Sequence, residues 1–456
     1  MQDLTEGSIP KHLVAMAAPI GIGMLFQTLY YLVDLYFVGR LGEAAIAGLG
    51  AAGNVQFLVM SVTQILGVGT MALIAHASGR KDTADANLVF NQSLVLALAC
   101  AVLTLGVGYA LAGPYMATLG ADPATMAAGR LYLHWFLPGL GLQFALVSMG
   151  SALRGAGVVK PTMMVQIATV LLNAVLSPIM IAGYGTGRPL GVLGAGLSTS
   201  ISVAVGVLLL WRYFHRHARF VRVDRALLAP RPDVWARVLR IGLPPGGEFA
   251  LMFVFMGVIY WVIRDFGAAA QAGFGVGSRV MQAIFLPAMA VAFATAPVAG
   301  QNVGAGRLDR VRATFHAAAL TGSVLMLLLT LFCQVRPDLL VTGFTDDPDV
   351  VAVGAEYLRI ISWNFVATGI IFTCSGMFQA LGNTVPSLLA SASRLLTFVL
   401  PAIWLAGREG FRLRHLWMLS VATVALQALA SWGMLAYHLR RRSAEMEVGT
   451  TARMRA

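Results

Sequence analysis

Twelve stretches of mostly apolar residues follow one another along this chain, separated by short polar gaps. A helix needs about 20 such residues to cross the hydrocarbon core of a bilayer, where the backbone must satisfy its own hydrogen bonds. The pattern therefore predicts an all-α integral membrane protein with twelve transmembrane helices. The predicted spans are 13–38, 46–76, 88–112, 131–153, 162–182, 192–213, 238–263, 271–299, 314–335, 352–379, 386–406 and 416–438.

Composition agrees with this class of protein. Charged residues make up 11% of the 456 residues, whereas a soluble domain carries about 25%. The first residues, "MQDLTEGSIPKH", lack the basic region and cleavage site of a secretory signal peptide, so we expect none. The three cysteines lie in apolar runs without metal-binding spacing, and we interpret them as inert: Cys100, Cys333 and Cys374.

The basic residues predict the orientation of the chain in the membrane. With the N-terminus in the cytoplasm, 21 of the 32 lysines and arginines fall on the cytoplasmic side and 8 outside, and three lie within spans. The positive-inside rule then places both termini in the cytoplasm. We attribute the net charge of +12 to this topology and to membrane lipid rather than to nucleic-acid binding.

The chain contains an internal repeat. Pro19 and Pro244 open equivalent helices 225 residues apart, and the same offset relates "GEAAIAGLG" to "GAAAQAGFG" and "GAGVVKP" to "ALGNTVP". Since each half has an even number of spans, we expect two six-helix bundles related by a parallel pseudo-two-fold axis along the membrane normal. In transporters built this way, the substrate binds between the halves.

The repeat also predicts the domain boundaries. We expect an N-terminal lobe at 1–213, an Arg-rich cytoplasmic linker at 214–237, a C-terminal lobe at 238–439 and a cytoplasmic tail at 440–456.

The motifs favour a transporter over an enzyme. The chain has no HExxH, GxSxG or P-loop motif, and its carboxylates are few and scattered. We therefore expect no enzymatic activity, no cofactor and no resident metal, with transport driven by an ion gradient or by a substrate running downhill. A membrane enzyme acting on lipids remains an alternative that would require a reactive cluster at one interface.

One carboxylate interrupts the apolar stretch "FQTLYYLVDLYFVGRLG". Gln27, Tyr30 and Asp34 recur at helical spacing on one face, and Gly23 extends it. A charge buried in hydrocarbon costs a few kcal/mol or more, so such residues usually face a cavity, a partner or a proton. The alternative is an interfacial Asp34 paired with Arg40, about 9 Å of helix rise away.

Several segments together resemble the multidrug and toxic compound extrusion (MATE) family. They are "PIGIGMLFQTLYYLVDLYFVGRLG", "LRGAGVVKP", "FQALGNTVP", "LLNAVLSPIMIAG" and "GVLGAGLSTS". The resemblance covers nearly the whole chain and includes the twelve spans and the repeat. It implies an antiporter that admits a proton or sodium ion while an organic, often cationic, compound leaves.

The resemblance also implies a coupling site. Asp34 matches the family's cation-binding aspartate of the N-terminal lobe, while Asn173 and Thr199 match its partners. Ser177 stands where some members carry a second aspartate, so one carboxylate remains. This favours proton coupling, with Na⁺ held by Asp34, Asn173 and Thr199 as the alternative. Pro19 matches the proline at which the family's first helix is thought to bend, which implies a hinge.

The residues themselves leave other interpretations open. Ordinary interhelical hydrogen bonding also explains Asn173, Ser177 and Thr199. We assign Gln27, Tyr30 and Glu248 to the substrate cavity. The alternative for Glu248 is an interfacial residue neutralised by Arg240. We expect the intramembrane arginines Arg279 and Arg394 to face the cavity or to snorkel.

The sequence thus predicts a monomeric multidrug antiporter of the bacterial cytoplasmic membrane that exports organic cations or drugs. The alternative is a lipid or oligosaccharide flippase of the same superfamily. A cavity for anionic head groups should hold several basic residues, whereas only Arg279 and Arg394 lie deep in spans.

Overall fold

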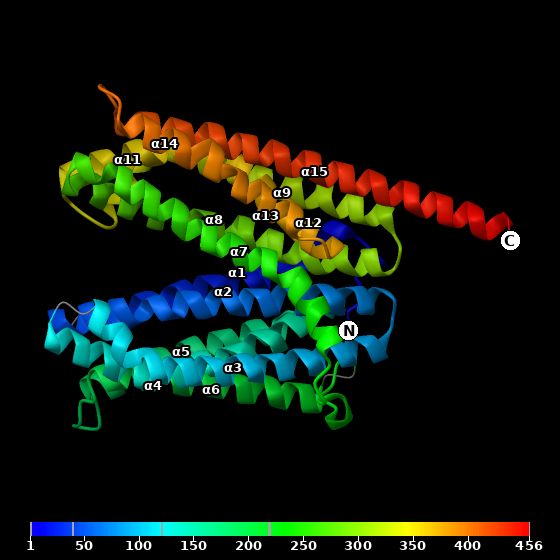
Figure 1. Ribbon diagram of the computed structural model, residues 1–456, viewed down its shortest axis with the longest axis horizontal. Helices are drawn as coiled ribbons and strands as arrows, with labels where there is room; N and C mark the ends of the chain where they lie inside the picture. Colours follow the sequence, from blue (N-terminus) through cyan, green and yellow to red (C-terminus); the bar gives the residue numbers. More distant parts are fainter. Residues whose placement is uncertain (1, 39–40, 120–121, 218–219, 456) are drawn as a thin grey trace. The chain divides into compact units, whose positions relative to one another are not determined.

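The computed structural model describes residues 2–38, 41–119, 122–217 and 220–455, except for the side chains of 30–35, 38 and 444–455. Throughout this described part the secondary structure is helical and no strand occurs. The part contains twelve candidate membrane spans, long and apolar enough to cross a bilayer (Figure 1). The predicted all-α membrane fold with twelve spans is confirmed.

Each span of the N-terminal half is a single helix that extends beyond the apolar stretch predicting it. For example, the third helix begins at Thr83, five residues before the predicted start at 88. Hydropathy marks only the part of a helix that lies in hydrocarbon, whereas polar residues continue the helix into the interface. The helices are α1 (Ile9–Val38), α2 (Glu43–Gly79), α3 (Thr83–Leu119), α4 (Pro123–Gly155), α5 (Lys160–Ala182) and α6 (Val192–Arg216).

Two predicted spans of the C-terminal half contain changes in helix type. The span at 352–379 is interrupted by a 3₁₀ turn at Ser362–Asn364, and the span at 386–406 contains a π-helical segment, η5 (Leu395–Val399). Pro401 explains the second change. It has no N–H to donate to the carbonyl group of Thr397, and its ring would clash with that carbonyl in a regular α-helix. The helices are α7 (Pro232–Ile263), α8 (Ala268–Gly304), α9 (Leu308–Val335), α10 (Pro337–Thr342), α11 (Pro348–Ile361), α12 (Phe365–Leu381), α13 (Val385–Arg394), α14 (Leu400–Ala406) and α15 (Leu413–Arg455).

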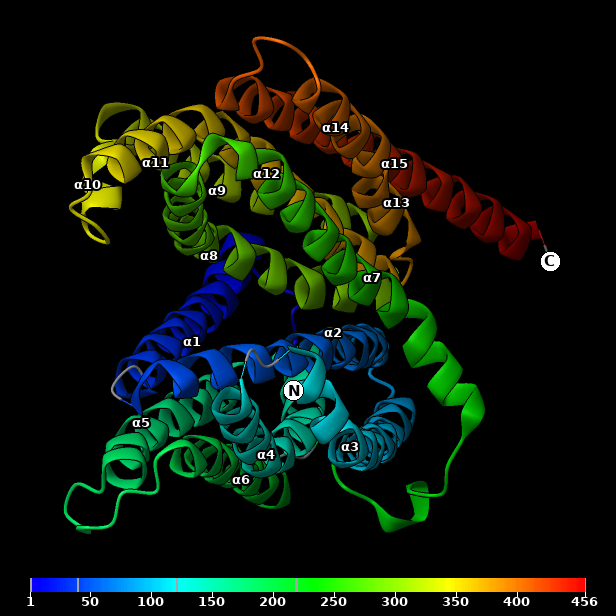
Figure 2. The same ribbon diagram turned by 60° about the vertical axis from the view of Figure 1, so that its left-hand side comes forward.

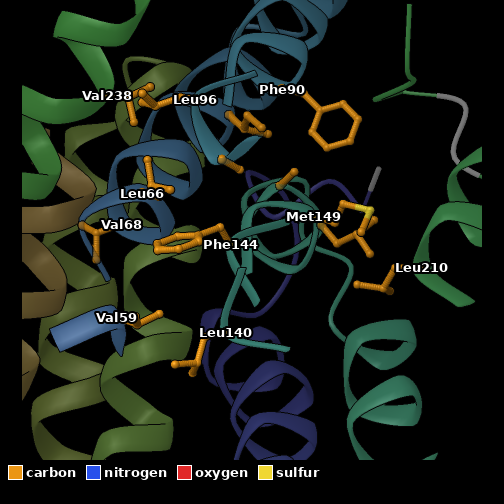
Figure 3. Close-up of a cluster of buried hydrophobic side chains, with 14 of the residues drawn as sticks. Val59, Leu66, Val68, Phe90, Leu96, Leu140, Phe144, Met149, Leu210 and Val238 are labelled. Atoms are coloured by element: carbon orange, nitrogen blue, oxygen red, sulfur yellow. The ribbon is translucent and has the colours of Figure 1, made fainter. Parts of the chain in front are cut away.

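Helix α4 lies at the centre of the N-terminal lobe, where it packs against α2, α3 and α6. Phe144 on α4 is buried in the apolar cluster drawn in Figure 3, together with Leu66, Val68 and Leu140. A Cβ on Gly155 would lie 2.7 Å from the carbonyl oxygen of Met71 on α2, so only glycine permits this approach. Small residues of this kind let membrane helices pack closely.

The repeated Asp-Pro pair begins a helix in both halves. The carboxylate of Asp122 accepts hydrogen bonds from the backbone N–H and the hydroxyl of Thr125, while Asp347 accepts from the N–H groups of Asp349 and Val350. The bonds from Thr125 lower the pKa of the Asp122 carboxyl below its ordinary value. In both places the following proline occupies a first-turn position, where its missing N–H costs nothing.

The chain divides into two compact units whose boundaries differ from the predicted ones. The first unit contains 1–3 and 18–243, and the second contains 4–17 and 244–456. Helix α1 therefore begins in the second unit and ends in the first, while α7 does the reverse. Helix α7 begins at Pro232, so the end of the predicted linker 214–237 is helical. Likewise, α15 continues into the predicted tail at 440–456.

Hydrogen bonds explain these exchanged segments. In the second unit, Gln301 accepts from the N–H of Leu4 at 3.0 Å, and Arg310 donates to the carbonyl of Gly7 at 3.0 Å. In the first unit, Arg237 of α7 forms an ion pair with Asp85 at 3.2 Å. Asp85 and Arg310 are 225 residues apart and therefore occupy equivalent positions of the repeat. Each binds one of the exchanged segments, although the two side chains carry opposite charges.

Replacing Gly242 by valine should destabilise the first unit by about 1–3 kcal/mol, because a Cβ there would overlap the carbonyl of Ile65 on α2. Thermal melting of the purified protein in detergent measures the effect. The control is Gly257→Val on the same helix, where a Cβ meets no heavy atom within 4 Å. Equal melting temperatures for the two variants would contradict the packing argument.

Candidate functional site

A cluster of polar side chains is buried between α5 and α6 of the N-terminal lobe. Ser177 donates to the side-chain oxygen of Asn173 at 3.0 Å and lies 3.3 Å from the hydroxyl of Ser198. The amide of Asn173 reaches Thr199 at 3.5 Å, the longest of these distances. Asn173, Ser177 and Ser198 are fully buried, and Thr199 is 8% exposed. The structure thus brings together three residues that the sequence places in one site.

Local helix geometry explains why these side chains converge. Asn173 and Ser177 are one turn apart on α5, while Ser198 and Thr199 both donate to the carbonyl of Ala195 on α6. A Cβ on Gly194 would lie 2.5 Å from the carbonyl oxygen of Met180, so the glycine lets α6 approach α5 closely. The hydroxyls and the amide therefore meet at hydrogen-bonding distance.

The chemistry of this cluster is that of neutral oxygens. Its members are hydroxyls and one carboxamide, and no carboxylate belongs to it among the described side chains. Hydroxyl and carbonyl oxygens coordinate hard cations, and they also accept from a protonated carboxyl group. The cluster can therefore complete a site whose charge comes from elsewhere.

Helix α1 contacts α5 two helical turns before Asn173. Gln27 accepts a hydrogen bond from the amide of Gln166 at 3.1 Å, and a Cβ on Gly23 would lie 2.6 Å from Gln166. Gln27 is half-buried. Tyr30 and Asp34 belong to α1, but their side chains lie outside the described residues.

Pro19 is buried inside α1, two residues after the segment that belongs to the second unit. A proline inside a helix removes one backbone hydrogen bond and marks a place where bending is easy. Its hinge role remains a prediction.

Glu248 lies in α7, half-buried, and accepts a hydrogen bond from Ser387 of α13. Its Oε1 has no hydrogen-bond partner. The substrate-cavity role of Glu248 stays a prediction.

The two intramembrane arginines differ in environment. Arg279 is exposed, whereas the guanidinium of Arg394 lies over the rings of Phe255 and Phe398. No group of three or more His, Cys, Asp or Glu residues within the described part is arranged to hold a metal ion.

Sequence reasoning missed three partners of the predicted residues: Gln166, Ser198 and Ser387. Gln166 carried a usable signal, because it is polar, lies in an apolar span and precedes Asn173 by two helical turns on the same face. Ser198 and Ser387 carried none, since serine is common in membrane helices and their contacts depend on how neighbouring helices pack.

Twelve candidate spans in two repeated halves make the described part of the chain a multipass membrane protein. Comparison with known proteins gives its class. Residues 19–179 and 244–405 both match the MatE family. The two matched segments begin at Pro19 and Pro244, the residues that open the internal repeat.

The chain is similar over most of its length to bacterial drug exporters. It is 26% identical over 384 residues to the Probable multidrug resistance protein YpnP of Bacillus subtilis, covering 83% of this chain and 84% of the relative. It is 25% identical over 441 residues to the Multidrug export protein MepA of Staphylococcus aureus, covering 95% and 94%.

A solved structure shows the same fold. It is described as the outward-facing conformation of a multidrug resistance MATE family transporter of the MOP superfamily. It has a TM-score of 0.89 at 25% identity, covering 96% of this chain and 97% of the other. The chain therefore belongs to the MatE family of multidrug efflux transporters, and the resemblance read from its motifs is confirmed.

Replacing Asn173 by alanine should destabilise the protein by about 1–3 kcal/mol, because Ser177 then loses its buried acceptor. Thermal melting in detergent measures the loss. The control is Thr169→Ala on the same helix, whose hydroxyl donates only to the carbonyl of Gln166 one turn earlier. If both variants melt together, the cluster does not act as a connected network.

Proposed function

We propose that this protein is a secondary antiporter that exports organic, often cationic, compounds in exchange for protons bound at Asp34. The observation that carries the proposal is the buried cluster of Asn173, Ser177 and Thr199, which supplies neutral oxygens inside a membrane span. Such a cluster stabilises a cation or a protonated carboxyl group, and its interior position suits a coupling site.

Helix register supports Asp34 as the charge of this site. Asp34 follows Gln27 by seven residues on α1, and Asn173 follows Gln166 by seven on α5. Because Gln27 and Gln166 are hydrogen-bonded and both helices are odd-numbered spans, two further turns bring Asp34 to the level of Asn173. Asp34 would then supply the negative charge that the cluster of neutral oxygens does not contain.

The pairing of one carboxylate with one amide and two hydroxyls favours a proton. A proton needs only the carboxylate and one acceptor, whereas sodium needs several oxygens around a largely dehydrated ion. In the described part of the cluster, Ser177 already donates to Asn173, which reduces the number of free acceptors. Na⁺ at Asp34, Asn173 and Thr199 is the competing assignment.

Pro19 offers a way to couple protonation to movement. Neutralising Asp34 removes a buried charge from α1, and Pro19 lies on the same helix where a backbone hydrogen bond is missing. We propose that α1 bends there during alternating access. The cytoplasmic location of both termini, from the distribution of arginines, belongs to the same proposal.

Asp34→Asn should leave the protein folded and inserted but reduce drug efflux from proteoliposomes to the level of empty vesicles. An asparagine fits the same space and cannot exchange a proton. The control is Asp122→Asn, which changes an exposed carboxylate outside the spans and retains a helix-capping side chain. Normal drug transport by the Asp34 variant would overturn the coupling assignment.

An imposed pH gradient should drive efflux in sodium-free proteoliposomes, with no added benefit from sodium. The measurement compares drug movement under a pH gradient alone with movement under a sodium gradient at equal pH. Full transport under sodium alone, with none under a pH gradient, would instead make Asn173, Ser177 and Thr199 sodium ligands. A lipid flippase would show lipid translocation and no drug movement under either gradient.

A further inference from the structure

Helix α6 of the first unit has an outward face that changes from apolar to basic. The side chains of Leu208 and Trp211 are 65% and 39% exposed, as expected of a membrane helix that contacts lipid. Arg212 and Arg216 follow Leu208 by four and eight residues, so they continue this face at the end of the helix. Both arginines are exposed. The face therefore becomes cationic where α6 leaves the hydrocarbon core.

The segment 220–231, which follows α6, lies beside α3 and is bound there by three side-chain amides (Figure 2). Asn87 accepts from the N–H of Arg222 at 2.7 Å, and Asn91 donates to the carbonyl of Arg222 at 2.9 Å. Gln92 donates to two further carbonyls of the segment, both at 2.7 Å. Asn91 and Gln92 are fully buried, so these bonds fix the backbone of the segment against α3.

An aromatic pair joins the end of α6 to the same part of α3. Phe90 of α3 stacks on Phe214 of α6 with ring centroids 4.6 Å apart, and both side chains are buried. Arg222 is bound to α3 on either side of Phe90, by residues 87 and 91. Phe214 lies between Arg212 and Arg216 in the sequence. The stacked rings therefore place these three arginines at the same end of the first unit.

The three arginines are not neutralised within the described part of the chain, where no ion pair includes Arg212, Arg216 or Arg222. Between residues 212 and 231 the sequence has one carboxylate, Asp224, which accepts from the backbone N–H of Ala226 at 3.0 Å. Exposed arginines next to a lipid-facing helix surface attract anionic head groups, and each strengthens binding about fivefold.

We propose that this surface binds an anionic phospholipid. The phosphate group lies against Arg212, Arg216 and Arg222, and an acyl chain lies along the exposed apolar face of α6 at Leu208 and Trp211. Such a lipid occupies a surface that already faces the membrane, so the site requires no internal cavity. The proposal goes beyond the proposed function, because lipid binding requires no ion gradient and no drug.

The test compares three probes: a short-chain phosphatidylglycerol, a phosphatidylcholine with the same chains, and inorganic phosphate. Thermal melting of the purified protein in detergent gives the concentration of each probe that produces half of the maximal rise in melting temperature. Phosphatidylglycerol should act at a concentration about tenfold or more below that of phosphatidylcholine, and added salt should weaken it. Inorganic phosphate should have no effect at these concentrations, because it has no acyl chain.

Variants locate the site. Arg212→Gln combined with Arg216→Gln should raise the half-effective concentration of phosphatidylglycerol about tenfold or more, and Arg222→Gln should raise it about fivefold. Replacing Arg212 and Arg216 by lysine keeps both charges and should retain most of the effect. The matched control is Arg130→Gln combined with Arg188→Gln, which removes two exposed arginines elsewhere in the first unit and should change the value less than about twofold. Melting without lipid shows whether each variant is folded.

Equal responses to the two phospholipids would overturn the proposal, because the acyl chains alone would then explain binding. Equal losses in the Arg212/Arg216 glutamine variant and in its control would also overturn it, since only net charge would matter. An equal response to inorganic phosphate would identify a site for free anions instead of lipid. Normal efflux by Asp34→Asn would refute the antiport assignment and leave these lipid measurements unchanged, so the two proposals can fail separately.

Discussion

The contact between the first and fifth helices of each lobe sets the position of the charged and polar groups within it. In the N-terminal lobe this contact is the Gln27–Gln166 hydrogen bond, and in the C-terminal lobe it is the Glu248–Ser387 hydrogen bond. In both cases the second residue follows the first by 139 positions. Because helices are rigid over two turns, one such contact fixes which residues face each other further along the pair.

The repeated frame carries different chemistry in the two lobes. The N-terminal lobe buries neutral oxygens at Asn173, Ser177 and Thr199, while the C-terminal lobe has Phe398 at the equivalent of Asn173 and a charged group one turn earlier, at Arg394. Neutral oxygens can stabilise a small cation or a protonated carboxyl group.

The twelve spans, the parallel repeat and the family were predictable because they depend on hydropathy, spacing and motifs. The exchange of residues 4–17 and 232–243 between the compact units was not, since it depends on Gln301, Arg310 and Asp85, whose partners are remote in sequence. Asn173, Ser177 and Thr199 were found through the family and do meet in space. The contact of the Arg394 guanidinium with two aromatic rings was not predicted, because Phe255 and Phe398 look like ordinary apolar residues in membrane spans.

The polarity of repeat-related positions shows how a duplicated fold can diverge without losing its architecture. Asp85 and Arg310 occupy one repeat position and both hold the start of a helix that belongs mainly to the other unit, the first by an ion pair and the second through backbone carbonyls. Both bonds lie near helix ends, where water weakens electrostatic interactions and either sign of charge is tolerated. Deep in the spans the exchange of sign is far less permissive, because each unpaired charge there needs a partner. Repeat-related positions could therefore diverge freely at the helix ends. In mid-span, a difference such as Asn173 in one lobe and Phe398 at the equivalent position of the other alters what each lobe can bind.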